Sequence, residues 1–493
     1  MQEASKPTNV RWRVFLLLAA ASFVAYVLRG SISIATPAMI ADLELSEIQF
    51  GWVVSAFLWS YTICQFPGGI FGDQVGPRKA LLLILVLASV GLLMTAAVPG
   101  PAVVAGGMVL GLMMFVRFLN GIIHGPVFPV ISLAICRWFP VGGWALPTGL
   151  TSSGLTLGYA ATAPIVTAMV LAFGWRISLL LLAPLGVLVA IFWSWYSRDN
   201  PGDHSGTNDA EVELIMANRP VTVTTEINPP GWVRILKNRN IILLTLSYSF
   251  SNFIFYSVFT WFPYYLITVR QIDPTTSGYA TASQWVAAAA GAALGGWLCD
   301  RWCRRVGLRW GGRWPIIVGQ LGCVVFLVIG AYHSDPMTAV IMLGLCFFFQ
   351  QITEGAYWSS SIAIGNQFAG AAGGIINTGA NAMGAVNALL VPWFASLFGW
   401  PFAVASAGIF TLIAMLLMLL VRADEPVPVD ESGTRCRADG QYAVRSIQAS
   451  QAGASYAHTD FYITSLGVCR QRSSSGRRCR SLSARQHANG QRR

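Results

Sequence analysis

The sequence predicts an all-α membrane protein with twelve transmembrane helices arranged as two pseudo-symmetric six-helix bundles. Of its 493 residues, 55% are hydrophobic and only 11% are charged, whereas soluble chains carry roughly 25% charged residues. The apolar residues form long blocks, and about 20 of them suffice to cross a bilayer as a helix. A motif around Asp73 returns around Asp300, 227 residues later, which indicates an internal repeat.

The twelve expected spans follow the apolar blocks in order, and each should be a helix because backbone groups in lipid must pair with one another. In the first half they lie near 14–40, 50–71, 80–99, 102–135, 147–173 and 177–196. In the second half they lie near 240–267, 277–299, 314–333, 337–365, 371–396 and 400–421.

This pattern predicts four parts of the chain. They are an N-terminal six-helix bundle over 1–196, a polar cytoplasmic linker over 197–239, a C-terminal six-helix bundle over 240–421 and a disordered cytoplasmic tail over 422–493. In the linker, Asp209–Arg219 is compatible with a short surface helix. The tail lacks apolar periodicity, so we interpret it as a solvated extension, with binding to anionic lipid as the lesser alternative.

The basic residues set the orientation. With the N-terminus inside, the inner segments before the tail hold 16 Lys and Arg, while the outer segments hold only Arg176 and Arg270. This bias predicts a multi-pass protein of the cell membrane, here a bacterial inner membrane, with both termini cytoplasmic. The net charge of +11 does not indicate nucleic-acid binding, because 12 of the 32 basic residues lie in the tail.

Catalytic and metal motifs are not found in the sequence. The nine cysteines show no paired ligand spacing. There is no HExxH motif, nucleophile elbow or Gly-rich phosphate loop. We therefore expect no catalytic residue, no metal site, no cofactor and no enzymatic activity. The basic N-terminus runs straight into an apolar block without a convincing cleavage site, so we expect a retained first helix.

Four ionisable residues fall deep in the expected spans, namely Arg29, Arg117, His124 and Glu354. A charge at mid-membrane costs about 2.5–3.5 kcal/mol even on the mildest scale, and such residues usually mark function. Two fixed positive charges against one negative leave the interior one charge short of neutrality. An anionic ligand would supply that charge.

Helical spacing places polar residues on shared faces. Tyr26 and Arg29 are three apart, Arg117 and His124 are seven apart, and Asn377 and Asn381 are four apart. Such stripes suit a central cavity, where an arginine can hold a carboxylate with two parallel hydrogen bonds. The predicted substrate-binding residues are Tyr26, Arg29, Tyr61, Arg117, His124, Asn377 and Asn381. Structural roles remain open for all of them and for Glu354, as partners or packing between helices.

The segment Gly69–Lys79 resembles the loop signature of the major facilitator superfamily. Within it, the chain most resembles the anion:cation symporter family, which includes transporters of sugar acids, hexuronates and phthalate. The segments that carry this likeness are Tyr26–Arg29, Trp59–Gly69, Arg117–Gly121, Phe128–Pro129, Trp261–Leu266 and Asn377–Asn381. The match covers about residues 12–421.

The resemblance implies the major facilitator fold and a monomeric secondary active transporter working by alternating access. Its substrate would be a small organic anion, a carboxylate such as a sugar acid or an aromatic acid. Gating is expected from Asp73 and Asp300 with Arg78 and Arg301, which would stabilise the state closed to the cytoplasm.

Proton-coupled symport is the mode that the family implies, but two of its coupling carboxylates are missing. Leu28 stands at one of these positions and His124 at the other. His124 and Glu354 remain as proton-coupling candidates, with histidine favoured by its titration near pH 6.5. Sodium coupling is the alternative.

Two rival functions stay open. An organophosphate or anion exchanger of the same fold usually carries an arginine in its seventh span, where this chain offers Asn252, Tyr256 and Trp261. A nutrient sensor without transport would keep the same binding site.

Overall fold

The computed structural model describes residues 6–217, 230–262, 265–271 and 273–427, and within these ranges the regular structure is entirely helical. By its contacts the chain divides into two compact units, Met1–Glu431 and Ser432–Arg493. The second unit, and with it most of the tail predicted to be disordered, lies outside the described residues. The domain boundaries at 196, 239 and 421 therefore stay predictions.

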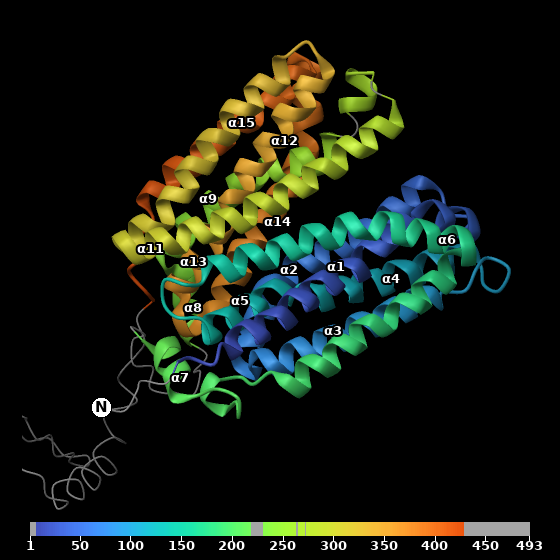
Figure 1. Ribbon diagram of the computed structural model, residues 1–493. Helices are drawn as coiled ribbons and strands as arrows, with labels where there is room; N and C mark the ends of the chain where they lie inside the picture. Colours follow the sequence, from blue (N-terminus) through green and yellow to red (C-terminus); the bar gives the residue numbers. More distant parts are fainter. Residues whose placement is uncertain (1–5, 218–229, 263–264, 272, 428–493) are drawn as a thin grey trace, which may run out of the picture. The chain divides into compact units, whose positions relative to one another are not determined.

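The helices follow the expected order (Figure 1). The first half contains α1 (Val10–Leu43), α2 (Glu47–Val75), α3 (Pro77–Ala96), α4 (Gly106–His124), α5 (Val127–Trp138) and α6 (Ala145–Tyr196). The linker contains η1 (Pro201–Asp203), α7 (Asp209–Met216) and α8 (Pro230–Lys237). The second half contains α9 (Arg239–Tyr256), η2 (Ser257–Trp261), η3 (Tyr265–Val269), α11 (Pro274–Tyr332), α12 (Pro336–Ile352), α13 (Glu354–Gly365), η4 (Asn366–Phe368), α14 (Ala369–Phe398) and α15 (Trp400–Leu420).

Seven helical stretches among the described residues are long and apolar enough to cross a membrane. Several contain an internal break. Gly174 divides α6 with a φ of 77° and a ψ of 164°, and Gly307 divides α11 with a φ of 80° and a ψ of 169°. Glycine adopts such angles without the penalty that a Cβ imposes. These breaks and one at Asn366, where φ is 48°, divide three of the seven stretches. With α2 and α9, which are not among the seven, the described helices follow the order of the expected spans.

The boundary between the eighth and ninth spans differs from the prediction. The segment 300–313 was expected to be a loop between the eighth and ninth spans, but it is helical on both sides of Gly307. The helices are therefore interrupted at one residue, Gly307, and not by a loop of fourteen residues, because a single glycine reverses the chain direction.

Large apolar side chains are exposed on the outer surface of the helices, as is expected of a surface that faces lipid. Leu171 is 83% exposed and Leu389 is 76% exposed, whereas Leu18, Leu85 and Trp193 are fully buried or nearly so. Soluble monomers rarely expose large contiguous apolar patches. The exposed side chains of α6 and α14 fit contact with lipid tails.

Close backbone contacts join the halves along two helix pairs, α2 with α14 and α6 with α11. A Cβ on Gly69 would collide with the carbonyl oxygen of Gly370, and a Cβ on Gly296 would collide with that of Ala145. Small residues let helix backbones approach in this way.

Two carboxylates hold the same two interfaces. Asp73 of α2 accepts hydrogen bonds from the backbone N–H groups of Gly370 (2.9 Å) and Ala371 (2.8 Å), at the start of α14. Asp300 of α11 accepts from those of Ala145 (2.8 Å) and Leu146 (2.9 Å), at the start of α6. The first N–H groups of a helix have no intrahelical partner, and the helix dipole favours an anion there. Each half therefore caps a helix of the other.

The expected basic partners lie elsewhere. Arg78 donates from Nε (3.0 Å) and Nη2 (2.6 Å) to the carbonyl of Ser194, within its own half. Arg301 lies over the ring of Trp297 on its own helix, 5.6 Å from the ring centre. Other arginines act electrostatically on the two carboxylates, Arg137 on Asp73 and Arg304 on Asp300.

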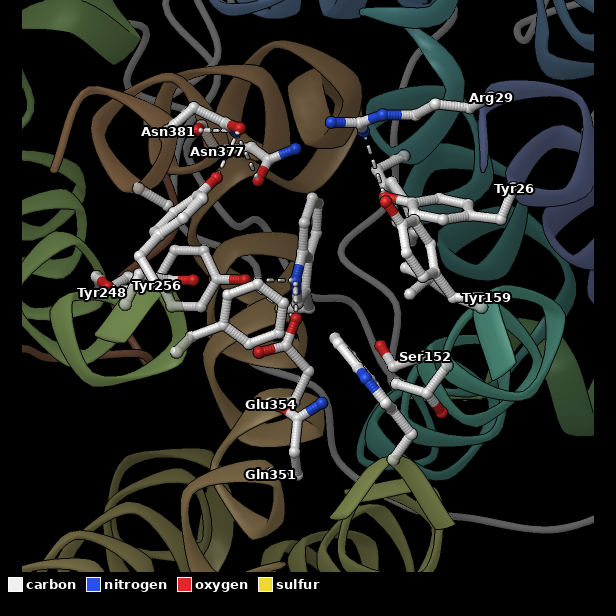
Figure 2. Close-up of a pocket in the computed structure, with 18 of the residues that line it drawn as sticks. Tyr26, Arg29, Ser152, Tyr159, Tyr248, Tyr256, Gln351, Glu354, Asn377 and Asn381 are labelled. Atoms are coloured by element: carbon white, nitrogen blue, oxygen red, sulfur yellow. Dashed lines mark hydrogen bonds between the residues drawn. The ribbon is translucent and has the colours of Figure 1, made fainter. Parts of the chain in front are cut away.

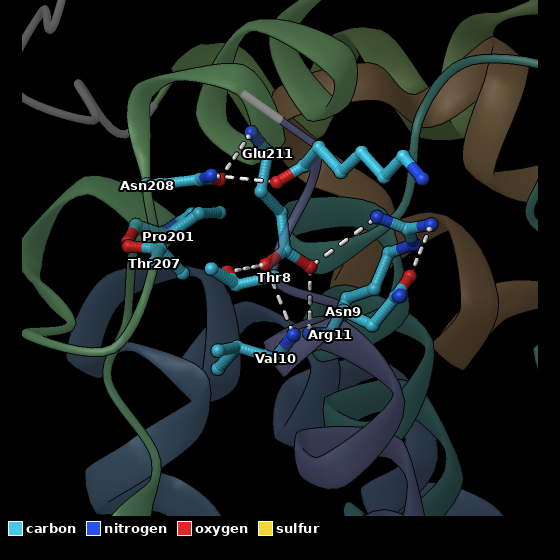
Figure 3. A network of polar contacts seen from close by, with 9 residues as sticks. Thr8, Asn9, Val10, Arg11, Pro201, Thr207, Asn208 and Glu211 are labelled. Atoms are coloured by element: carbon cyan, nitrogen blue, oxygen red, sulfur yellow. Dashed lines mark hydrogen bonds and ion pairs between the residues drawn. The ribbon is translucent and has the colours of Figure 1, made fainter.

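The linker is tied to the start of α1 by one buried side chain, Glu211 of α7 (Figure 3). Its carboxylate accepts from the backbone N–H groups of Val10 (2.9 Å) and Arg11 (3.1 Å), from Arg11 Nη1 (3.2 Å) and from the Thr8 hydroxyl. Burial alone would raise the pKa of Glu211, but the hydrogen bonds and the Arg11 charge outweigh it, so this pKa lies below its usual value. The short helix predicted over 209–219 is confirmed as far as Met216, and its last two residues lie outside the described residues.

Replacing Glu211 with alanine should lower the unfolding temperature in detergent more than the control Glu213→Ala, because Glu213 is an exposed glutamate on the same helix. Losing a helix cap costs about 0.5–2 kcal/mol. Because its pKa is lower in the folded protein than in the unfolded chain, Glu211 stabilises the fold at pH values above its unfolded-state pKa. This stabilisation is lost as the pH falls through the folded-state pKa. The difference in unfolding temperature between wild type and Glu211→Ala should persist from neutral pH to about pH 5 and disappear in stronger acid. A difference in unfolding temperature that disappears as the pH rises would contradict this role.

Candidate functional site

A cavity of about 120 Å³ lies between the two halves. Residues of α1, α2, α5 and α6 form one wall, and residues of α9, α11, α12, α13 and α14 form the other. Five of the seven predicted binding residues line it, and they come from the first, second and eleventh expected spans: Tyr26, Arg29, Tyr61, Asn377 and Asn381.

Arg29 of α1 carries the positive charge of the first wall. Its guanidinium lies 4.4 Å from the ring centre of Tyr61, 5.1 Å from that of Phe57 and 5.5 Å from that of Tyr26. Aromatic faces attract a cation but do not neutralise it. The ion pairs found among the described residues do not include Arg29.

Two predicted binding residues, Arg117 and His124, lie behind this wall and are not among the residues that line the cavity. Both are buried on α4. The guanidinium of Arg117 lies 4.4 Å from the centre of the Phe57 ring, and the ring of His124 lies 6.1 Å from it. Arg117 Nε has no hydrogen-bond partner within the described part of the chain. Both side chains thus lie near the Phe57 ring, and neither lines the cavity beside Arg29.

Amide groups form the opposite wall near Arg29. Asn377 Nδ2 donates to Gln65 Oε1 (2.7 Å), which links α14 to α2 across the halves. The Tyr256 hydroxyl donates to Asn381 Oδ1 (2.8 Å). Figure 2 shows the Arg29 side chain extending across the cavity towards Asn377 and Asn381. A carboxylate placed there would meet a guanidinium and amide donors together.

Glu354, at the start of α13, carries the negative charge of the cavity. Its Oε1 accepts from the Tyr248 hydroxyl (2.8 Å) and from Trp358 Nε1 (2.9 Å). Figure 2 places it beside Gln351 and away from Arg29. The cavity thus has a positive end supplied by the first half and a negative end supplied by the second.

Several lining residues were not predicted. Tyr159 and Trp285 stack across the halves with ring centres 5.8 Å apart, and aromatic residues in apolar spans give no sign of facing a cavity rather than lipid. Gln351 was also missed, although Gln351 and Glu354 have the same spacing of three residues that marked Tyr26 and Arg29.

Comparison with known proteins gives consistent relatives. A probable sulfoacetate transporter of Cupriavidus necator is 29% identical, over 82% of this chain and 93% of the relative. A hexuronate transporter of Bacillus subtilis is 27% identical, over 76% of this chain and 86% of the relative. A D-galactonate transporter of Escherichia coli is 27% identical, over 85% of this chain and 97% of the relative.

Solved structures show the same fold. The fucose:proton symporter of Escherichia coli superposes with a TM-score of 0.64 at 14% identity, covering 84% of this chain and 99% of the other. The human organic anion transporter MFSD10 superposes with a TM-score of 0.62 at 14% identity, covering 83% and 99%.

The family model of the Major Facilitator Superfamily matches residues 18–308 and 271–459 of the sequence. These ranges together span most of the chain, including both walls of the cavity. The resemblance found in the loop signature and the spans is therefore confirmed at the level of the superfamily, whose members here are transporters and not enzymes. The chain belongs to the Major Facilitator Superfamily.

Proposed function

We propose that this protein is a secondary active transporter of a small organic anion, a carboxylate such as a sugar acid or an aromatic acid. The observation that carries the proposal is Arg29, a cation at the cavity wall without a carboxylate partner among the described residues. The relatives named for hexuronate and D-galactonate support an acidic substrate.

The energetics favour a ligand at this position. A guanidinium in mid-membrane needs a counter-charge, and aromatic contacts contribute only about 0.5–2 kcal/mol. A carboxylate would form two charge-assisted hydrogen bonds with Arg29. Tyr26, Tyr61, Asn377 and Asn381 would then orient it, while Arg117 and His124 would act on its charge without lining the cavity.

A phosphate-ester exchanger is the runner-up. A dianionic phosphate calls for a second cation in the cavity, and Arg29 is the one Lys or Arg among the described residues that line it. This favours a carboxylate substrate. A sensor would bind the same ligand but would show no flux in proteoliposomes.

Alternating access would use the two capping carboxylates. Asp73 and Asp300 each hold the start of a helix in the other half, so opening this end must break both pairs of hydrogen bonds. Arg78 and Arg301 would contribute by fixing helix ends within their own halves. The Lys and Arg bias assigns this end, with both termini, to the cytoplasmic side of a bacterial inner membrane, and we propose a monomer as the working unit.

Coupling to protons is the mode we propose, with His124 as carrier and Glu354 as the other candidate; sodium is the alternative ion. Arg29 and Arg117 both act electrostatically on His124 and oppose a positive charge there. A substrate anion bound to Arg29 would cancel part of this repulsion. Substrate and proton would then each favour binding of the other, as linkage requires.

Arg29→Lys should weaken binding of the transported acid by on the order of tenfold, about 1.4 kcal/mol, because an ammonium cannot reproduce the two-point contact of a guanidinium. Uptake into proteoliposomes and ligand-induced thermal shifts measure the effect. Arg176→Lys is the matched control, since Arg176 pairs with Asp42 outside the cavity. Full uptake by Arg29→Ala would overturn the assignment.

His124→Gln should lose accumulation driven by an inward proton gradient while keeping exchange of labelled for unlabelled substrate, because only the proton step needs a titrating side chain. The measurement is uptake into proteoliposomes with an imposed pH gradient, and His204→Gln in the linker is the matched control. Gradient-driven accumulation by His124→Gln would remove His124 as the carrier. A wild type without pH dependence would point to sodium coupling or exchange.

A further inference from the structure

We propose that Glu354 makes the cavity selective for monoanions whose far end carries hydroxyl donors, and that it excludes dianions of the same length. This inference rests on the proposed function, since it concerns the end of the substrate opposite the carboxylate held by Arg29. It assigns a specificity-determining role to a residue at the negative end of the cavity.

The hydrogen bonds of Glu354 leave one carboxylate oxygen for a ligand. Oε1 already accepts from Tyr248 and Trp358. Within the described part of the chain, Oε2 has no protein donor and no basic partner. Trp358 Nε1 can only donate, which fixes Oε1 as an acceptor. An accepting oxygen that faces a cavity selects a ligand with a donor.

The two ends of the cavity are chemically opposite. Arg29 offers donors and positive charge, and Glu354 offers an acceptor and negative charge; Figure 2 shows them apart, with Gln351 and Ser152 near the Glu354 end. A polyhydroxy acid bound by its carboxylate at Arg29 would present hydroxyl donors to Glu354. A second carboxylate would place acceptor against acceptor and like charge against like charge in a site of low dielectric.

The protein's own tyrosine supports the same preference. Tyr248 donates a hydroxyl hydrogen to Glu354, so a hydroxyl group is the kind of donor that this carboxylate accepts. A substrate hydroxyl can bind Oε2 without displacing Tyr248. The cavity therefore accepts added hydroxyl groups more readily than added charge.

The test uses matched ligand pairs that differ by one carboxylate. D-galactonate is compared with galactarate, D-gluconate with D-glucarate, and benzoate with terephthalate, by thermal shift and by competition for uptake into proteoliposomes with purified full-length protein. The wild type should bind the monoanion of its preferred skeleton at least tenfold more tightly than the dianion. Glu354→Gln, which keeps the shape but removes the charge, should lower the ratio of monoanion to dianion affinity at least tenfold, because the dianion is no longer repelled and the monoanion loses a charged acceptor for its hydroxyl groups.

Two further variants keep the result interpretable. Glu354→Asp retains the charge and should retain the preference for the monoanion, and Glu44→Gln removes a carboxylate outside the cavity and should change nothing. Equal wild-type affinity for both members of a bound pair, or an unchanged preference in a folded Glu354→Gln, would overturn this inference while leaving the proposed function intact. Failure of every one of these acids to bind would overturn the proposed function itself.

Discussion

Two buried carboxylates, Asp73 and Asp300, hold the halves of this transporter together by capping helices across the interface. Each accepts two backbone hydrogen bonds from the first turn of a helix in the other half. The caps work only because glycines such as Gly69 and Gly296 let the backbones touch beside them. The same helix pairs, α2 with α14 and α6 with α11, contribute residues that line the central cavity. The arrangement of the site thus depends on this reciprocal capping.

The cavity divides its charges between the halves, with Arg29 on one and Glu354 on the other. A ligand that satisfies both ends must touch both halves, so its binding free energy depends on how the halves are placed. This dependence is what alternating access requires, because a ligand can shift a conformational equilibrium only by its differential affinity for the two states. The hydrogen bond from Asn377 of α14 to Gln65 of α2 (2.7 Å) lies next to Arg29, so a ligand bound at Arg29 would act on this hydrogen bond directly.

Long apolar blocks predicted the helices, and polar stripes within them indicated Arg29 and Asn377, which line the cavity. The sequence could not show what each stripe faces. Arg117 lies on an equally regular stripe, yet it is buried on α4 and does not line the cavity. The aromatic pair Tyr159 and Trp285 was not predictable, since its stacking joins helices from different halves.

The most direct test of the reciprocal caps is a distance distribution across the opposite end of the molecule. Spin labels are placed at Leu171→Cys on α6 and Tyr279→Cys on α11, in a background without native cysteines. Both positions are exposed and lie far along their helices from Ala145 and Asp300. Pulsed electron paramagnetic resonance then measures the distance between the two labels at that end. If the caps hold the cytoplasmic end closed, Asp73→Asn combined with Asp300→Asn should shift the population towards shorter label distances. A distribution unchanged by both substitutions would contradict the account.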